Sequence, residues 1–156
     1  MLDRDNAAFI LTGVSIILAS CAPNRLPSMS RGLGCRVLDG GRQVSVFLRR
    51  SQSEELLEKI RHSGRVANVF SLPSSNRTLQ LKGSDARIFP VAAEDLPIIE
   101  RHIADFVLEV VPLGMPEAVV RAILAYQPDD LVAVTYSPSA AFSQTPGPKA
   151  GEPLAT

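Results

Sequence analysis

Arg77-Thr78-Leu79-Gln80-Leu81-Lys82-Gly83 is the stretch that decides how this chain folds. Apolar and polar side chains alternate along it, as they do on a strand that buries one face. The two leucines of the run then face the core, while Thr78, Gln80 and Lys82 share the opposite face. That polar row is either a wall that meets a polar partner or a solvated sheet face, and the run itself leaves both open.

Six runs of the chain have the composition of short β-strands, because they are rich in β-branched and apolar residues. Turn residues separate the runs, and Asp39-Gly40-Gly41 predicts a hairpin between the second and the third. Short strands joined in this way predict a mainly β protein with flanking helices. The runs are residues 9–20, 28–37, 43–48, 65–72, 77–89 and 131–136.

Two glycines, Gly32 and Gly34, interrupt the second run. Glycine weakens the interior of a strand, so it often marks a bulge or a place where another backbone or a ligand approaches closely. A plain bend at the corner of a barrel explains the same two residues. The sequence leaves both interpretations open.

A helix is predicted after the third run, because Ser51-Gln52-Ser53-Glu54 has the spacing of a capping box with Ser51 at the N-cap. Gly64 is expected to end this helix. Arg49 and Arg50 precede it, and free N–H groups beside two arginines can hold a phosphate. Alternatively, the capping box already satisfies those N–H groups and the arginines are solvated.

One domain accounts for most of the chain, since 156 residues are enough to bury a single core. We expect this domain to span residues 1–137. It includes a helical segment at 93–125, in which Pro97 is tolerated in the first turn. Residues 138–156 are rich in proline and lack apolar periodicity, so they predict an extended tail that lies along a surface.

Composition argues against several classes of function. The 16 Lys and Arg residues balance 16 Asp and Glu, so no basic excess is present to attract nucleic acid. The two cysteines (Cys21, Cys35) and two histidines (His62, His102) lack metal-ligand spacing, and we expect no metal site. No P-loop, nucleophile elbow or Gly-rich dinucleotide fingerprint occurs in the sequence.

The apolar segment 7–20 raises the question of targeting, because Leu18-Ala19-Ser20-Cys21 has the form of a lipoprotein cleavage box. A signal peptide needs a positive start, whereas Met-Leu-Asp-Arg-Asp is net negative. The segment is also too short to span a bilayer. We therefore expect a buried first strand, an unmodified Cys21, no membrane partner and a cytoplasmic location.

The order of these elements resembles the pyridoxamine 5'-phosphate oxidase-like family over residues 8–90. The resemblance rests on Gly64-Arg65-Val66-Ala67 after the predicted helix and on the polar-faced run 77–83. It implies a six-stranded antiparallel split β-barrel with Greek-key connections and a homodimer. It also implies flavin mononucleotide (FMN) bound in two equivalent sites at the dimer interface.

The resemblance further implies which residues contact the flavin. The second strand, the start of the helix and the polar-faced run each supply part of the site. Two departures stand out: the second strand has no lysine, and Glu54-Glu55-Leu56 replaces the family's Ser-Arg-Lys phosphate clamp. The implied cofactor-binding residues are Ser30, Arg31, Gly32, Arg49, Arg50, Ser51, Arg77, Thr78, Gln80 and Lys82.

Three hypotheses follow. The first is an FMN-binding redox protein that acts on an unassigned small molecule, with Gln80 and Lys82 near the ring or substrate. No catalytic base is identified. Oxidation of pyridoxamine phosphate is not expected, because residues 146–151 lack the family's substrate-contacting arginine. The second hypothesis is a split-barrel dimer that binds another ligand, or none, without redox activity. The third is haem, which needs an axial ligand.

Overall fold

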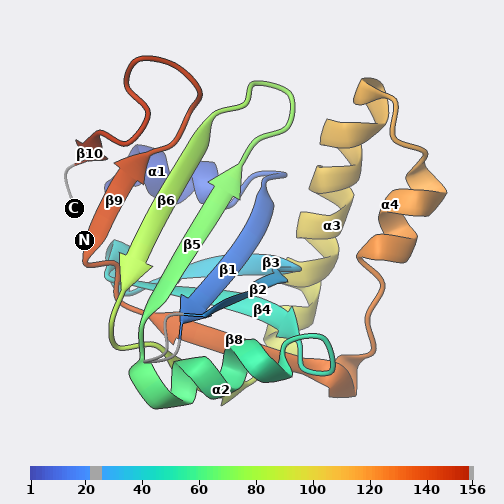
Figure 1. Ribbon diagram of the computed structural model, residues 1–156. Helices are drawn as coiled ribbons and strands as arrows, with labels where there is room; N and C mark the ends of the chain where they lie inside the picture. The colour runs from blue at the N-terminus through green and yellow to red at the C-terminus, as the bar shows by residue number, and fades with distance from the viewer. Residues whose placement is uncertain (22–25, 155–156) are drawn as a thin grey trace.

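The computed structural model describes residues 1–21 and 26–154, which form two antiparallel sheets with helices around them (Figure 1). The strand order is β10-β9-β6-β5-β1-β2 in the larger sheet and β3-β4-β8-β7 in the smaller one. The strands are β1 (Ser15–Cys21), β2 (Pro27–Arg31), β3 (Gly34–Leu38), β4 (Gln43–Arg49), β5 (Val66–Ser71), β6 (Thr78–Gly83), β7 (Arg87–Pro90), β8 (Leu131–Tyr136), β9 (Ala140–Ser143) and β10 (Pro153–Leu154). The helices are α1 (Arg4–Ile10), α2 (Glu54–Ser63), α3 (Leu96–Val110) and α4 (Glu117–Ile123), with 3-10 turns at Asp39–Gly41, Ala93–Asp95, Val111–Leu113 and Pro128–Asp130.

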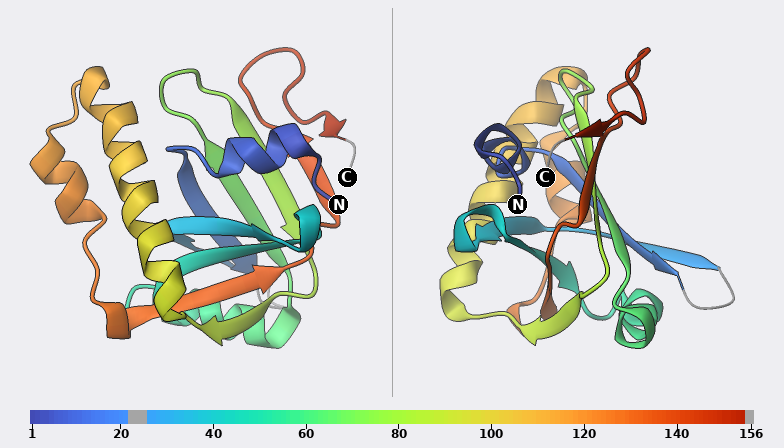
Figure 2. Two further views of the ribbon diagram at one scale, coloured as in Figure 1. Left: turned by 180° about the vertical axis from the view of Figure 1, so that it is seen from behind. Right: turned by 90° about the vertical axis from the view of Figure 1, so that its left-hand side faces the viewer.

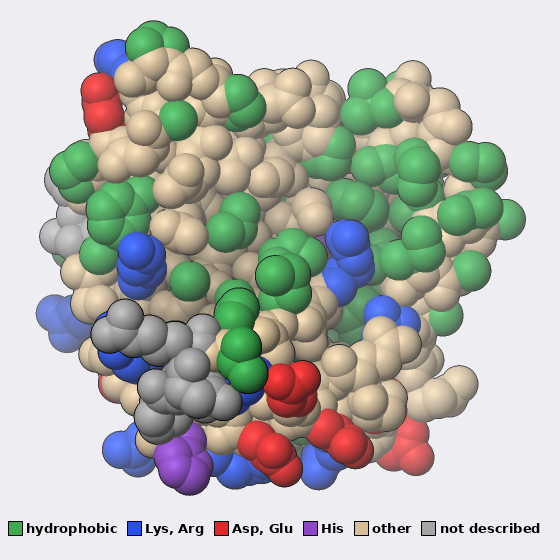
Figure 3. Space-filling view, viewed as in Figure 1, with side chains coloured by type: hydrophobic (Ala, Val, Ile, Leu, Met, Phe, Trp, Pro, Cys, Tyr) green, Lys and Arg blue, Asp and Glu red, His purple; other side chains and the backbone are tan. Residues whose placement is uncertain are grey.

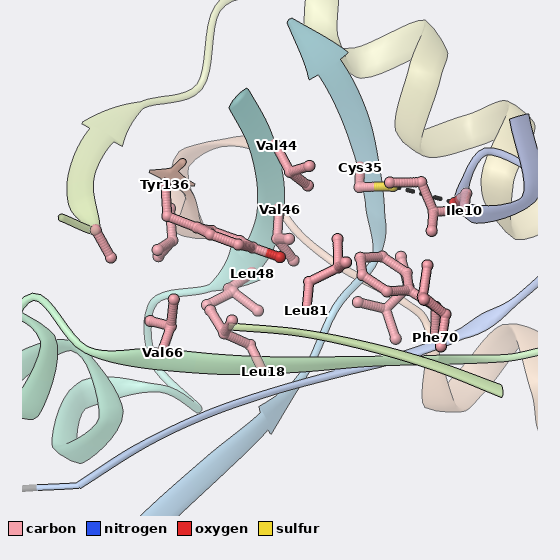
Figure 4. Packing of buried hydrophobic residues seen from close by; sticks show 14 of the residues in the cluster. Ile10, Leu18, Cys35, Val44, Val46, Leu48, Val66, Phe70, Leu81 and Tyr136 are labelled. Atoms are coloured by element: carbon pink, nitrogen blue, oxygen red, sulfur yellow. Dashed lines mark hydrogen bonds between the residues drawn. The ribbon is translucent and has the colours of Figure 1, made fainter. Parts of the chain in front are cut away.

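The inner faces of the two sheets pack against each other and form the main core (Figure 4). Phe70 and Leu81 of the larger sheet meet Val46 and Tyr136 of the smaller one, and all four are buried. Burying an aliphatic or aromatic side chain of this size contributes about 1.5–3 kcal/mol. The Tyr136 hydroxyl accepts a hydrogen bond from the side-chain amide of Asn68 at 3.1 Å, which gives the phenol a partner inside the core.

A second core lies between the outer face of the smaller sheet and α3, which runs along that face (Figure 2). Leu33, Phe47 and Ala133 face outward from the sheet and pack against Ile99 and Ile103 of the helix. Pro97 lies in the first turn of α3, as predicted, where its missing N–H costs no hydrogen bond. The smaller sheet is therefore covered on both faces.

The first predicted strand is shorter than expected. Residues 4–10 form α1, which begins after Asp3, whose side chain accepts a hydrogen bond from the Asn6 N–H at 2.8 Å. Phe9 and Ile10 at its end are buried, so a single apolar run serves both a helix and the following strand. Apolar periodicity over so short a segment does not separate the two structures.

Two predicted strands are each divided between the sheets. The run 28–37 bends at Gly32, and the run 77–89 is interrupted between β6 and β7. The Gly32 N–H donates to the carbonyl of Ile16 at 2.9 Å, and a Cβ on Gly32 would lie 2.7 Å from Ile16 Cγ2. Both interpretations of this glycine are therefore seen together: the strand bends at Gly32, and β1 approaches it closely there.

The two sheets enclose the core in the manner of a split barrel, but the described residues form ten strands where six were expected, because two predicted runs are each divided and the tail adds two. β9 pairs with β6 from Leu79↔Ser143 to Lys82↔Ala140, and β10 pairs with β9. β8, which we expected to be the last strand, lies between β4 and β7 in the smaller sheet. β9 and β10 thus widen the larger sheet at its edge. None of the helices formed by the described residues has the length and apolar character needed to cross a membrane.

Candidate functional site

A small groove lies where β2 passes the turn between β4 and α2. Its volume is about 170 Å³. It gathers two strands and a turn that are far apart in the sequence, and it includes three of the predicted cofactor-binding residues. Its lining residues are Met29, Ser30, Arg31, Arg49, Gln52 and Ser53.

Two arginines give this groove its charge. Arg31 Nη1 donates to Ser15 Oγ at 3.2 Å, and Arg49 Nη1 donates to the carbonyl oxygen of Ala125 at 2.8 Å. The Arg49 Nε is buried and has no hydrogen-bond partner among the described residues. Ser30 is turned inward, and its hydroxyl donates to the Gln52 carbonyl at 3.2 Å. The groove is therefore cationic, and only part of its hydrogen-bonding capacity is used within the chain.

Ser51 does not cap the helix, so that prediction is wrong. The N-cap of α2 is Ser53, whose side chain makes no capping hydrogen bond, and Glu54 is the first helical residue instead of N3. The Gly64 end of the helix is confirmed, with a φ of 62°. No side chain caps α2, and its N-cap residue, Ser53, lines the groove.

Ser51 instead binds Asp130, which comes from the turn before β8. The carboxylate accepts from the Ser51 N–H at 2.8 Å and from the Ser51 hydroxyl at 2.6 Å. These hydrogen bonds hold the pKa of Asp130 below its usual range. Arg50 is exposed, and its backbone N–H donates to the Asp130 carbonyl at 2.6 Å. The hydrogen-bond donors of Ser51, which was predicted to hold phosphate, are therefore already bound to a carboxylate of the chain.

The polar face of β6 is confirmed: Leu79 and Leu81 are buried, and Lys82 is exposed on the other side. Lys82 Nζ lies 4.7 Å from the centre of the Phe142 ring in β9, a cation–π contact. The Gln80 side chain makes no hydrogen bond within the described chain. Thr78 is already engaged, because its hydroxyl lies 2.8 Å from that of Ser71.

Arg77 belongs to a different part of the molecule. Its guanidinium lies 4.0 Å from the centre of the Phe9 ring and donates to Asn6 Oδ1 at 3.1 Å. Both partners are in α1, which packs on the inner side of the larger sheet (Figure 2). Arg77 is thus separated from the polar row with which it was grouped.

The structure brings the groove and the polar row of β6 to one face, but it does not bring them together. The strand pairings align Arg31, Ile17, Val69 and Gln80 in a single row across the larger sheet. β1 and β5 lie between β2 and β6, so the two ends of the row are three strand spacings apart, roughly 14 Å. Within one copy of the chain, Arg31 and Gln80 are therefore too far apart to make adjacent contacts with the same group of a ligand.

The outer face of the larger sheet has no cover among the described residues (Figures 1 and 3). Its centre is apolar, with Ile17 and Val69 beside Ala19 and Ala67. Outward-facing positions of β1, β2, β5, β6 and β9 carry no Asp or Glu, whereas Arg31 and Lys82 are present. The centre of this face is apolar, and Lys82 is exposed at its β6 end.

Sequence reasoning missed several residues of this region, chiefly Met29, Gln52, Ser53, Asp130 and Phe142. Met29 could have been found, because it alternates with Arg31 on the same strand face. Asp130 could not, since nothing local links it to a serine 79 positions earlier. Neither histidine lines the groove, and the described residues contain no cluster of His, Cys, Asp or Glu that could hold a metal ion.

Comparison with known proteins identifies the fold. No protein-family model matches the chain, and no curated protein matches it. HupZ of group A Streptococcus is 12% identical, with a TM-score of 0.56, and the match covers 97% of this chain and 100% of HupZ. A structure described as an F420 reductase is 16% identical, with a TM-score of 0.57, covering 90% of this chain and 98% of its own.

A third structure, from Lactobacillus delbrueckii, is provisionally assigned as a pyridoxamine 5'-phosphate oxidase. It is 14% identical, with a TM-score of 0.54, and the match covers 90% of this chain and 93% of that protein. Similarity at these identities shows the fold alone. The fold is the split barrel of the pyridoxamine 5'-phosphate oxidase-like proteins, as the sequence predicted.

Proposed function

We propose that this chain forms a two-fold dimer that binds FMN in two equivalent grooves and uses it in a redox reaction on a small molecule not yet identified. The observation that carries the proposal is the bare outer face of the larger sheet, which is apolar at its centre and cationic toward both ends. The fold supports the same function by analogy.

The apolar centre is the argument for a dimer. Ile17, Ala19, Ala67 and Val69 would remain in contact with water in a single copy, because no helix of the described chain covers them. A two-fold axis places the same patch of two copies face to face, so each copy would cover the apolar centre of the other. Aligned sheets pack in this way in many proteins.

The charges on this face are the argument for an anionic ligand. Arg31 and Lys82 from each copy would bring four cations to the interface without any acid from the outward-facing strand positions. Like charges brought together at an interface are costly. A dianionic phosphate bound between Arg31 and Arg49 would relieve that cost and would add charge-assisted hydrogen bonds. The uncapped N-terminus of α2 supports the same position.

The size of the groove supports a site shared between two copies. At about 170 Å³ it is smaller than the 300–1,000 Å³ usual for ligand pockets, so one chain offers space for only part of a mononucleotide. Arg31 and Arg49 would hold the phosphate end. Gln80 and Lys82 of the second copy would meet the rest of the ligand. Bound FMN would supply the hydride chemistry, and the protein would orient it and exclude water.

One observation favours the second hypothesis, a dimer without redox function. Ser51 already donates a hydrogen bond to the Asp130 carboxylate, and Glu54 and Glu55 lie in the first turn of α2. These carboxylates oppose a second anion nearby. Glu55 is partly neutralised, because Lys59 Nζ lies 2.5 Å from its Oε1. The balance between these charges and the two groove arginines decides whether phosphate binds.

Titration of the purified chain with FMN and with riboflavin tests the proposal. The fluorescence of both flavins should be quenched when they bind the protein, and FMN should bind at least about 10-fold more tightly than riboflavin, because a hydrogen bond to a charged group contributes about 1.5–3 kcal/mol. Equal affinities would show that the phosphate is not held. The absorption spectrum of the protein as purified separates the hypotheses, since flavin bands, a Soret band and a colourless sample are distinct.

A further inference from the structure

An apolar patch covers the end of α3, the turn after it and α4. Hydrophobic side chains gather over these two helices in Figure 3, on the same side of the molecule as the bare sheet face. The patch consists of large hydrophobic residues whose exposed fractions run from 40 to 72%: Leu108, Val111, Leu113, Met115, Val119 and Ile123.

The helices already bury their other sides, so the patch is not a loosely packed core. Val107 and Val110 of α3 and Val120 of α4 are buried in the second core, whereas Leu108, Val119 and Ile123 point away from it. The charged side chains of α4 neutralise each other, because Arg121 Nε donates to Glu117 Oε1 at 2.7 Å. A contiguous, electrically neutral apolar surface of this kind marks an interaction site on a soluble protein.

A second exposed apolar feature lies on the same side of the molecule. β1 and β2 project beyond the body of the protein on the side of the bare sheet face (Figure 2). Met29 of β2 is 65% exposed and faces outward beside the cationic groove, which it helps to line. The chain therefore presents a projecting apolar residue and an exposed apolar patch on one side.

We propose that the α3–α4 patch seats the β1–β2 hairpin of a second copy of this chain, so that each copy closes the groove of the other. This inference rests on the dimer of the proposed function and names a contact within it. The two features are reciprocal, since a two-fold axis that carries one hairpin onto the partner's patch carries the other hairpin back. Met29, at the edge of the groove, would then be covered by the partner's helices.

The sheet face alone offers little area for a stable dimer interface, which supports a contribution from the α3–α4 patch. A stable interface buries about 800 Å² on each partner. The outward positions at the centre of the larger sheet are small or already half-buried, as Ala19 and Ala67 are, so they leave little further area to bury. Six half-exposed aliphatic side chains add roughly 200–350 Å², if a fully buried one removes about 60–120 Å² from water. The patch thus supplies area that the sheet face lacks.

Light scattering on the full chain tests this contact without any flavin. Val119→Lys and Ile123→Lys should each raise the dimer dissociation constant at least about 100-fold, because an unpaired charge would be buried in the interface. Leu11→Lys is the matched control. Leu11 is 45% exposed, like Ile123, but it follows α1 on the other side of the larger sheet, and its variant should remain dimeric.

A cross-link identifies the contact itself. Chains carrying Met29→Cys are mixed with chains carrying Val119→Cys, both with Cys21→Ser, and are oxidised. A disulfide-linked heterodimer is expected on a non-reducing gel. If the Val119→Lys variant remains dimeric, or if the mixed cysteine variants form no cross-link, this inference is overturned and the proposed function stands. A monomeric wild-type chain overturns the proposed dimer itself and is seen before any substitution is made.

Discussion

The two sheets of this barrel differ in how their outer faces are finished. The smaller sheet turns Phe47 and Ala133 outward, and α3 packs over them with Ile99. The larger sheet turns Ile17 and Val69 outward, and nothing in the described chain packs over them. Both faces are apolar at the centre, so the difference lies in the source of the cover. One sheet is covered by its own chain, and the other is the face that the proposed dimer would cover.

We expect the two outer faces to affect different properties, folding stability in one case and assembly with ligand binding in the other. Residues under α3 are buried whether or not a partner is present, and they should determine the free energy of unfolding of the single chain. Residues on the bare face should instead determine assembly and ligand binding. The predictions below test that division in order of expected effect.

The largest effect is expected under the covered face. Phe47→Ala should lower the free energy of unfolding by about 3–5 kcal/mol, because a fully buried phenyl ring is removed and a cavity remains. Urea unfolding at two protein concentrations measures the loss. Val69→Ala on the bare face is the matched comparison and should lower the stability of the monomer much less. Comparable losses for the two variants would contradict the division between the faces.

The bare face should respond to charge more than to truncation. Val69→Lys should raise the dimer dissociation constant by about 100-fold or more, since it places an unpaired charge at the centre of the interface. Sedimentation equilibrium measures the change, and the far-UV circular dichroism spectrum should remain that of the wild type. If Val69→Lys forms dimers as well as Val69→Ala does, the larger sheet is not the interface.

The covering helix should make stability depend on pH. Burial lowers the pKa of His102 to about 4, although nearby Asp105 and the Val14 carbonyl act in the opposite direction. The unfolded chain, with a histidine pKa of about 6.5, binds more protons between pH 4 and 6.5, so stability should fall by up to about 3 kcal/mol as the pH drops through that range. Urea unfolding across these pH values measures the slope. His102→Gln should remove most of it, and an unchanged slope would exclude His102 as its source.

Ligand binding should distinguish the arginines of the groove from their neighbour. Arg31→Gln and Arg49→Gln should each weaken FMN binding about 10- to 150-fold, because each would lose a charge-assisted hydrogen bond to phosphate. Arg50 is exposed and does not line the groove, so Arg50→Gln should change the affinity less than about threefold. Flavin fluorescence titration measures all three variants. Equal effects at Arg31 and Arg50 would show that the groove does not hold the phosphate.

The smallest effect is expected at Ser51. Ser51→Ala removes the hydroxyl that donates to Asp130, so the pKa of this carboxyl should rise toward its ordinary value. A carboxyl with a lowered pKa stabilises the fold above its unfolded value of about 3.8, and that contribution is lost as the pH falls through its folded value. The variant should therefore be less stable by under about 1 kcal/mol at pH 7, since the pair is exposed. The difference from wild type should shrink as the pH falls below the ordinary carboxyl pKa of 3.8, and a difference independent of pH would exclude Asp130 as its cause.

Local patterns predicted the elements of the fold well. The alternation of the run 77–83 correctly placed Leu79 and Leu81 in the core, because strand periodicity is a property of neighbouring residues. The hairpin at Asp39-Gly40-Gly41 and the helix end at Gly64 were also predicted correctly, since turns and caps need few residues. The prediction of Ser51 as the N-cap was wrong because serines at positions 51 and 53 can each begin a helix. The distant Asp130 binds the first of them, and the helix begins after the second.

The site depended on contacts that no local pattern contains. Arg77 and Lys82 belong to the same sequence run, yet α1 binds the first and β9 the second. The separation of Arg31 from Gln80 by two strands could be known only from the order of the sheet. Residues 140–143 form β9 because they pair with β6, since a proline-rich segment has little strand propensity of its own.

The molar mass of the wild-type chain in solution tests the central claim most directly. Multi-angle light scattering at micromolar concentration should give twice the mass of one 16.8 kDa chain, with and without FMN. That result would mean that a second copy covers the bare face of the larger sheet. A single-chain mass at these concentrations would contradict the account, because the apolar face would then be stable in water and the two halves of the site would never meet.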